Sequence, residues 1–452
     1  MTSHRRKRNP VPSSRSSSAL LSAVVATEKG DIVDLEGFAA VGADGPRLSP
    51  LTVADTISLP HGSELMFLPD RVPLLMDLST GSIRPVSHHP CFPRQRIFPV
   101  AAFNSPGVVL THTCAHHADK NASALPLFAY GAVGWSENGF RSAALVVDRQ
   151  PRQDLRQMPR NKILAGVETL RRELPDNRLA RHLEHCALTY GCPAGKNFFL
   201  GRYEAPLPTS RACNARCLGC ISLQQNPLLV SSQNRIAFTP SPQEIADVAL
   251  CHIRRVKKSV VSFGQGCEGD PLMAARVIGP AIIRIREKTA GGTINMNTNA
   301  SLPHVLKPII DAGLDSIRVS LNSVREALYQ AYFRPKGYGF SNVLESMDQA
   351  LSSGVHVAIN YLNCPGVTDA PEEAEALFRF LEKYPVHLIQ WRNLNFDPPL
   401  YHAMMAAAAP LGPPVGMAEL IKSVQKAFPL LRHGYFNPPK EHFPPPARKS
   451  LT

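Results

Sequence analysis

The most distinctive chemistry in this chain lies in three cysteines on one short stretch, Cys213, Cys217 and Cys220. Their C-x3-C-x2-C spacing allows three thiolates to converge on one small inorganic centre. A structural zinc site takes four protein ligands, and a fully ligated four-iron cluster also takes four. Three thiolates on a four-iron cubane would leave one iron open to a substrate or a cofactor. The odd local number of cysteines argues against a disulfide framework.

Strands and helices alternate regularly after residue 200, and they are the elements that must position these cysteines. The apolar runs predict six strands, at 204–209, 259–263, 293–298, 316–321, 355–361 and 386–391. Five helices are expected between them, at 242–255, 273–288, 302–312, 340–352 and 372–383. This order indicates an α/β fold of parallel βαβ units joined by right-handed crossovers. Ligands of such sheets bind beyond the carboxyl ends of the strands, and the cysteines directly follow the first strand.

In this context the cysteine spacing resembles that of the radical S-adenosylmethionine (radical SAM) superfamily, over residues 202–397. The resemblance implies a partial (β/α)6 TIM-like barrel in which Cys213, Cys217 and Cys220 are the metal ligands and hold a [4Fe-4S] cluster. The open iron would chelate the amino and carboxylate groups of S-adenosylmethionine. Reductive cleavage of this cofactor would give a 5′-deoxyadenosyl radical, which abstracts hydrogen from a substrate. The protein would supply positioning and exclusion of water.

Four later loops agree with the superfamily in order. The stretch 264–272 is similar to its glycine-glycine-glutamate loop, in which glycines let backbone carbonyls approach the ligand and an acid complements an ammonium. Cys267 and Glu268 are inserted relative to the superfamily's loop. They leave open whether Gly266 or Gly269 is the central glycine, and whether Glu268 or Asp270 faces the ligand. Ser320 and Asn322 stand two positions apart at a strand end, so both should point to one face. The cofactor-binding residues implied by the resemblance are Gly264, Gly266, Glu268, Gly269, Asp270, Thr298, Asn299, Ser320 and Asn322.

Further polar residues follow the last two strands. Segment 360–369 resembles the superfamily's stretch beside the adenine. Gln390, Arg392 and Asn395 are candidates to line the floor of the cavity and to contact substrate. Ala300 stands where the superfamily's threonine-asparagine-glycine turn has its glycine.

The rest of the chain divides by composition. Residues 1–18 read as a disordered basic tail, 19–150 as a β-rich N-terminal domain and 151–200 as a helical connector, with the stretch 190–196 made of turn residues. The core spans 201–397, and 398–452 form a C-terminal extension with a proline-rich basic tail. Of the net charge of +13, residues 1–18 hold +5 and residues 432–452 hold +3. The apolar run 19–26 is far shorter than the roughly 20 residues of a membrane span, and we expect a strand there rather than an export signal.

Other cysteines and histidines invite a second metal interpretation. Cys186 and Cys192, with His182 and His185, precede the cluster cysteines. They are too few for a second cubane unless Cys91, Cys114 or Cys267 joins them. We therefore do not expect an auxiliary cluster. The histidines and cysteines between residues 88 and 117 fit no recognisable ligand spacing.

Oxygen-sensitive cluster chemistry implies a low-potential electron donor such as flavodoxin or ferredoxin, a reducing interior and a cytoplasmic location. The substrate stays open between a peptide or protein side chain, a modified RNA base and a small metabolite. The basic tails favour RNA slightly. The β-rich domain could recruit substrate or cover the open barrel. Two alternatives are an iron–sulfur or zinc protein that binds nucleic acid without catalysis, and an activase for a glycyl-radical enzyme.

Overall fold

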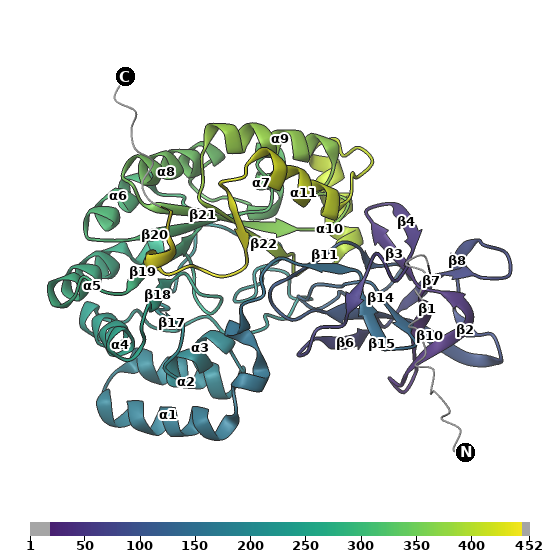
Figure 1. Ribbon diagram of the computed structural model, residues 1–452, viewed down its shortest axis with the longest axis horizontal. Coiled ribbons are helices and arrows are strands. Elements are labelled where there is room, and N and C mark those ends of the chain that lie inside the picture. Colours follow the sequence, from purple (N-terminus) through teal and green to yellow (C-terminus); the bar gives the residue numbers. More distant parts are fainter. Residues whose placement is uncertain (1–18, 445–452) are drawn as a thin grey trace, which may run out of the picture.

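The segment after residue 200 folds into a curled sheet of seven parallel strands in the order of the chain (Figure 1). The computed structural model describes residues 19–444. The strands are β17 Glu204–Pro206, β18 Val260–Phe263, β19 Thr293–Thr298, β20 Ser316–Leu321, β21 His356–Asn363, β22 Leu388–Asn393 and β23 Arg432–Gly434. The first six are the predicted strands: β19 and β20 have the predicted bounds, and the other four have shifted ends. The seventh comes from the region expected to be an extension, and it pairs in parallel with β22.

Helices cover the convex face of this sheet. They are α4 Pro242–Arg255, α5 Ala275–Lys288, α6 Pro303–Asp311, α7 Glu326–Phe333, α8 Phe340–Ser352, α9 Pro371–Lys383, α10 Pro398–Ala408 and α11 Met417–Ala427. Helix α4 starts with a full capping box between Ser241 and Glu244. Such a box satisfies two amides at the helix start. Outward strand residues such as Met296, Val319 and Ile359 are fully buried under the helices. Helices α7, α10 and α11 were not predicted from the sequence.

The inner face of the sheet is polar. Strand residues that alternate with the apolar ones point to this side, and they hydrogen-bond to one another. Asn295 Nδ2 donates to Asn297 Oδ1 over 2.8 Å. Arg318 Nη1 donates to Gln390 Oε1 over 2.9 Å, and Gln390 Nε2 donates to Asn437 Oδ1 over 3.0 Å. An interior lined by polar groups suits a barrel that receives a ligand better than one filled by its own side chains.

The N-terminal part is rich in antiparallel strands, as expected. The turn at 28–31 joins β1 and β2, which pair in antiparallel fashion. Its strands are β1 Ser22–Thr27, β2 Ile32–Ala39, β3 Val41–Asp44, β4 Arg47–Pro50, β5 Ile57–Ser58, β6 Glu64–Phe67, β7 Arg71–Asp77, β8 Ile83–Pro85, β9 His88–His89, β10 Phe92–Phe103, β11 Val108–Leu110, β12 Thr113–Cys114, β13 His116–Ala118, β14 Val133–Ser136, β15 Gly139–Ser142 and β16 Ala144–Val146.

This β-rich part lies against the carboxyl end of the parallel sheet (Figure 1). At the end of β22, the Asn393 side chain accepts from the Leu110 amide and donates to the Val108 carbonyl, each over 2.9 Å. Arg71, which is buried, donates to Asp397 over 3.3 Å. The N-terminal part therefore borders the end of the barrel where ligands of parallel sheets bind.

Three helices connect the two parts, α1 Arg160–Glu173, α2 Arg178–Leu188 and α3 Pro193–Phe199. The first two were predicted. The expectation of turn structure throughout 190–196 is wrong, because α3 begins at Pro193. Proline is well suited to a first helical turn, and the helix is fixed by the complete burial of Phe198 and Phe199.

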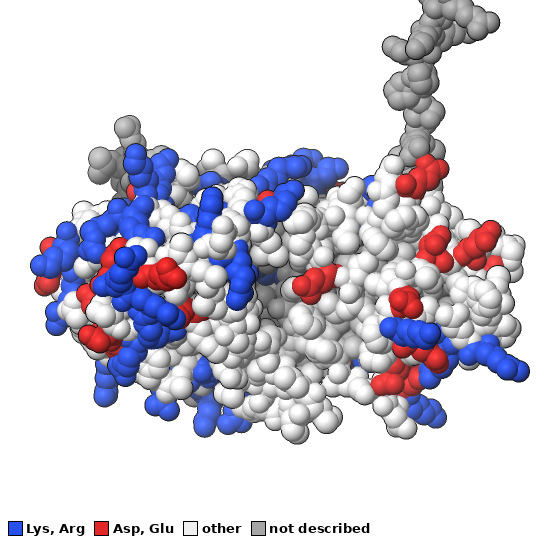
Figure 2. All heavy atoms as spheres, turned by 90° about the horizontal axis from the view of Figure 1, so that it is seen from below, with Lys and Arg blue, Asp and Glu red and all other residues white. Residues whose placement is uncertain are grey.

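Basic side chains gather on the side of the molecule formed by these helices and α4, at the left of Figure 2. Several are paired with acids: Arg171 with Glu184, and Arg178 with Glu244. The predicted basic tail at 1–18, and residues 445–452 of the proline-rich tail, lie outside the described residues. Between residues 19 and 444, no helix is both long enough and apolar enough to cross a membrane.

Candidate active site

The three cysteines lie on the loop that follows β17, and their thiols are close enough to influence one another electrostatically. Burial raises the pKa of Cys213 to about 11, and the charges of Asp270 and Cys220 add to the effect. The pKa of Cys217 is raised still further, by burial first and then by Cys213 and Cys220. Such thiols stay protonated when alone, whereas a bound metal ion would deprotonate them. The loop thus presents two thiols, Cys213 and Cys217, whose ionisation calls for a cation.

Helix α7 holds this loop from one side. The amides of Arg216 and Leu218 donate to the carbonyls of Phe333 and Tyr332, over 2.8 and 3.1 Å. Gly219 fits between the loop and its surroundings, because a Cβ there would lie 2.8 Å from the Asn395 carbonyl oxygen. The loop is therefore fixed by backbone contacts rather than by its own secondary structure.

A cavity of about 230 Å³ opens beside Cys217 and Cys220. Its lining includes Gln224, Arg235 and Phe396. Arg235 reaches the Cys220 thiol, with Nη2 3.8 Å from Sγ.

Glu268 connects residues 264–272, the glycine-rich loop, to the segment that leads to the cysteines. Its Oε1 accepts the amides of Gly264 and Gln265, over 2.7 Å each. Its Oε2 accepts the amides of Thr209 and Ser210, over 2.8 Å each. Burial raises the pKa of Glu268 to about 7, although the four amides oppose this shift. Both oxygens are thus engaged by the backbone.

Asp270 occupies the position nearer to the cysteines. It accepts from the amides of Asn299 and Leu272, over 2.6 and 3.0 Å, and from the Thr298 hydroxyl over 2.9 Å. Burial raises its pKa to about 6, against the effect of these donors. Its charge in turn raises the pKa of Cys213. Asp270 is therefore the acid of this loop whose charge reaches Cys213 and Cys217.

Thr298 and Asn299 join the glycine-rich loop to the cysteine loop. Thr298 binds Asp270, while Asn299 Nδ2 donates to Asn214 Oδ1 over 2.9 Å. Ala300 has a φ of 56°, which is the left-handed conformation that favours glycine. This explains why its turn resembles one that carries a glycine.

The three glycines of the loop differ in what surrounds them. A Cβ at Gly264, which has a φ of 77°, would overlap the Asn297 carbonyl. A Cβ at Gly269 would overlap the Ala212 carbonyl. A Cβ at Gly266 would meet only side-chain atoms, those of Gln233 and Ile221. Gly264 and Gly269 thus allow close backbone packing, whereas Gly266 is bordered by groups that can move.

Ser320 and Asn322 are placed differently from each other. Ser320 lies half-buried on β20, next to Asn360 of β21. Asn322 follows the end of the strand, so the alternation of faces does not extend to it. Its Nδ2 donates to the Leu328 carbonyl and to the Tyr401 hydroxyl, each over 3.1 Å. Asn322 therefore connects the strand end to α7 and α10.

The three candidates on and after β22, Gln390, Arg392 and Asn395, also differ in their surroundings. Gln390 is fully buried in the inner polar network, and Arg392 lies over the Tyr435 ring at 3.7 Å. Asn395 meets the cysteine loop through its carbonyl group at Gly219. Buried polar atoms without a partner remain on the inner face, at Arg318 Nε, Asn360 Oδ1 and Arg392 Nε. Since such atoms are costly to bury unpaired, this face fits a polar ligand.

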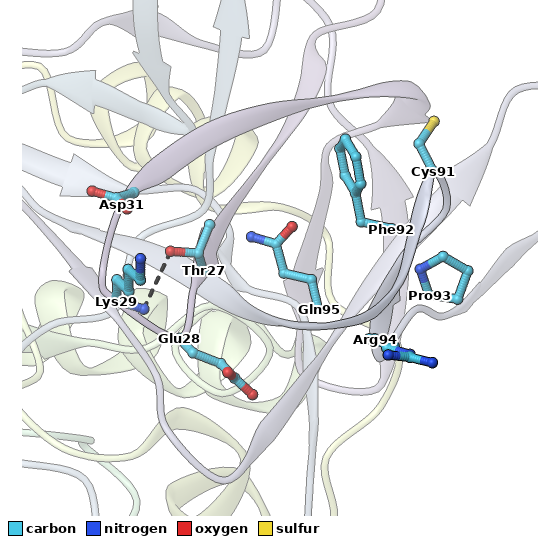
Figure 3. Close-up of a pocket in the computed structure, with 9 residues that line it drawn as sticks. All are labelled: Thr27, Glu28, Lys29, Asp31, Cys91, Phe92, Pro93, Arg94 and Gln95. Atoms are coloured by element: carbon cyan, nitrogen blue, oxygen red, sulfur yellow. Dashed lines mark hydrogen bonds between the residues drawn. The ribbon is translucent and has the colours of Figure 1, made fainter.

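A second, more open hollow of about 660 Å³ lies in the β-rich part, and Cys213, Cys217 and Cys220 do not line it (Figure 3). It is lined by Thr27, Glu28, Lys29, Asp31, Cys91, Phe92, Pro93, Arg94 and Gln95. Figure 3 shows these side chains spread around the hollow rather than directed at a common point. We assign no chemistry to it.

Comparison with known proteins identifies the parallel-sheet region. Residues 207–381 match the family model of the radical SAM superfamily. These residues form a radical SAM domain. Proteins of this superfamily use a [4Fe-4S] cluster and S-adenosylmethionine.

Curated relatives match this radical SAM region in part. GTP 3′,8-cyclase of Heliobacterium modesticaldum is 27% identical over 178 residues, which cover 39% of this chain and 50% of the relative. GTP 3′,8-cyclase of Staphylococcus aureus is 25% identical, with 42% and 53% covered. Molybdenum cofactor biosynthesis protein 1 of Bos taurus is 26% identical, with 42% and 30% covered. The matches thus span about half the length of the cyclases and less of the bovine protein.

Two solved structures are similar at low identity. A radical SAM methyltransferase from Sphaerobacter thermophilus has a TM-score of 0.36 at 17% identity, covering 51% of this chain and 66% of its own. SuiB of Streptococcus suis has a TM-score of 0.36 at 13% identity, covering 57% and 54%.

Sequence reasoning missed the residues that connect the loops, among them Asn214, Thr209 and Tyr332. Each acts through backbone or amide contacts between segments that are far apart in the chain. Only the position of Asn214 inside the cysteine motif could have drawn attention to it.

Proposed function

We propose that this radical SAM protein is an enzyme in which Cys213, Cys217 and Cys220 hold a [4Fe-4S] cluster that binds S-adenosylmethionine. When bound, these groups supply a 5′-deoxyadenosyl radical that abstracts hydrogen from a substrate. The observation that carries the proposal is the position of the cysteine loop at the carboxyl end of the parallel sheet, where Asn214 of this loop binds Asn299 and Asn299 in turn binds Asp270. This arrangement offers three ligands to the cluster and leaves space next to them.

Asp270, rather than Glu268, is the acid we assign to the cofactor side. Both carboxylate oxygens of Glu268 accept hydrogen bonds from backbone amides, four in all, and so Glu268 stabilises the conformation of the loop. Asp270 lies within electrostatic reach of Cys213 and is connected to Asn299. A buried carboxylate at this place would orient an ammonium group by charge. Gly264 and Gly269 keep the loop close to the two backbones that it contacts.

We infer that the substrate carries negative charge. Arg318 and Arg392 lie near each other on the inner face, and the charge of Arg392 contributes to lowering the pKa of Arg318, which burial lowers most, to about 9. Each has a buried Nε without a partner. An anion between the two guanidinium groups would relieve their repulsion and satisfy these donors. Two of the relatives are named for GTP, which is such an anion.

The β-rich domain is our candidate for a substrate-recruiting or covering domain. Its contacts with Asn393 and Asp397 place it next to the open end of the barrel, which supports that role. The helices of 151–200 join it to the core, which we assign to 201–397 together with β23. The chemistry requires a low-potential electron donor of the flavodoxin or ferredoxin type and a reducing compartment such as the cytoplasm.

A non-catalytic nucleic-acid-binding protein is the alternative from another class. The basic side of Figure 2 favours it, although several of those arginines are paired with acids. Such a protein would not need the linked loops around Asp270. A glycyl-radical activase would need a large protein partner, and the site offers no feature specific to one.

Electron paramagnetic resonance tests the proposal directly. The protein would be reconstituted with iron and sulfide without oxygen, reduced, and examined with and without S-adenosylmethionine. We expect a [4Fe-4S]⁺ signal that changes on addition of the cofactor. A cluster whose signal is unchanged at saturating cofactor would contradict the catalytic role and support the alternative.

A further inference from the structure

A second group of metal-ligating side chains lies behind the glycine-rich loop. His182 and Cys186 stand four positions apart on α2, so that they share one face of the helix. Cys267, from the glycine-rich loop, meets them there. One ligand atom from each residue lies within 4.8 Å of the others, and among the described residues no other histidine, cysteine or carboxylate group of three or more does so. The Cys186 and Cys267 side chains are almost completely buried, at 1% and 5% exposed.

The spacing of these atoms fits one tetrahedral ion. Cys186 Sγ lies 3.5 Å from His182 Nε2. Zinc bonds of about 2.3 Å to sulfur and 2.0–2.1 Å to nitrogen, at a tetrahedral angle, place the two ligand atoms about 3.6 Å apart. An iron–sulfur cubane would spread its ligands over separate corners, which is a wider arrangement. The group is thus sized for a single ion.

Cys192 lies beside this group, at the start of α3. Its amide donates to the Cys186 carbonyl over 3.0 Å, whereas its thiol is not among the three ligand atoms that lie within 4.8 Å of one another. One histidine and three cysteines are a ligand set of structural zinc sites. We propose that His182, Cys186 and Cys267 bind a zinc ion that fastens α2 to the glycine-rich loop, and that the Cys192 thiol turns toward the ion to become its fourth ligand.

Through Cys267, the ion would be attached to the loop that Glu268 holds. Cys267 directly precedes Glu268, whose carboxylate holds the backbone of the loop. Its carbonyl also accepts the Ile236 amide over 2.8 Å. A zinc ion here would attach the glycine-rich loop to α2, on the side of the loop away from the cysteine loop. Positioning of S-adenosylmethionine through this loop rests on the proposed function, whereas zinc binding itself does not.

Two other fates of the same residues are chemically distinct. Cys186 and Cys267 could form a disulfide on oxidation, although both are free thiols in this structure. The four residues could instead hold a second iron–sulfur cluster. Either result would replace zinc rather than accompany it.

The test is metal analysis of the full-length protein, purified without oxygen and supplied with zinc. We expect about one zinc per chain, in wild type and also in the triple variant Cys213→Ala, Cys217→Ala, Cys220→Ala. Zinc at the wild-type level in that triple variant, together with loss of its iron, would separate this site from the proposed active site. Replacement by Co²⁺ should give sulfur-to-cobalt charge-transfer absorption.

Variants of the ligands decide the assignment. His182→Ala and Cys186→Ser should bind less than about a tenth of the wild-type zinc. His182→Cys supplies another ligand and should retain zinc, which guards against a loss caused by misfolding alone. Cys251→Ser, which changes a buried thiol outside the group, is the matched control and should also retain it. Wild type without zinc, zinc kept in Cys186→Ser, extra iron at these residues, or a mapped Cys186–Cys267 disulfide would each overturn the proposal.

Discussion

Asp270 accepts the backbone amide of Asn299 over 2.6 Å, and this bond ties the loop after β18 to the turn after β19. The same Asn299 reaches Asn214 within the cysteine motif. Asp270 and Asn299 thus link three loops from separate strands, and the charge of Asp270 raises the pKa of the Cys213 thiol. The geometry of the candidate site depends on this junction more than on any one strand.

Asp270→Asn should weaken binding of S-adenosylmethionine while the cluster still assembles. The amide keeps the size of the side chain but removes the charge that would orient an ammonium group. We expect the dissociation constant to rise at least about tenfold, as loss of one charge-assisted hydrogen bond implies. Isothermal titration calorimetry on the reconstituted protein measures it. Unchanged affinity would show that another group faces the cofactor.

Glu268→Gln should instead act on folding. An amide nitrogen would replace one carboxylate oxygen, and it would face backbone N–H groups that are donors themselves. We expect a loss of about 2–4 kcal/mol in the free energy of unfolding. Urea unfolding of the cluster-free protein tests this. A loss smaller than that of Asp270→Asn would reverse the roles that we assign to the two acids.

Gly269→Ala should disrupt the loop, because the new Cβ would overlap the Ala212 carbonyl on the way to Cys213. We expect a loss of about 3 kcal/mol or more in unfolding free energy, together with poor cluster assembly. Gly266→Ala is the control, since its neighbours are side chains that can move. Equal effects of the two substitutions, measured by urea unfolding and by iron content, would contradict this account of the loop.

His252 gives the protein a defined sensitivity to acid. It is fully buried, and burial lowers its pKa to about 4 from an ordinary 6.5. The unfolded chain therefore binds a proton between pH 6.5 and pH 4 that the folded chain does not, so stability falls as the pH falls through this range. The contribution is about 3 kcal/mol. In His252→Gln, the fall in unfolding free energy between pH 6.5 and 4 should be smaller by about this amount. Identical pH profiles would refute the shift.

Arg318→Gln and Arg392→Gln should weaken binding of an anionic substrate. With GTP as the probe, we expect the dissociation constant to rise at least about tenfold in each variant. Arg171→Gln, on the exposed surface of α1, controls for general loss of positive charge. Binding that is equally strong in all four proteins would place the anion elsewhere, and absence of GTP binding in wild type would exclude GTP as that anion.

The parallel core could be predicted from the sequence because its signals are local. The apolar runs and the cysteine spacing each lie within a few residues. The seventh strand is only three residues long, and it is defined by pairing with β22 rather than by its own pattern. Helix α3 was not predicted, because residues 190–196 are of types that favour turns. The different duties of Glu268 and Asp270, and the approach of Cys267 to His182, depend on contacts between distant segments that no local pattern encodes.

The most direct test of the central claim is formation of 5′-deoxyadenosine. Reconstituted protein would be incubated without oxygen with S-adenosylmethionine and dithionite, and the product measured by liquid chromatography and mass spectrometry. We predict that it forms with wild type and with Cys251→Ala, and disappears in Cys213→Ala, Cys217→Ala and Cys220→Ala. A fully assembled cluster that neither binds the cofactor nor yields the product would contradict the claim.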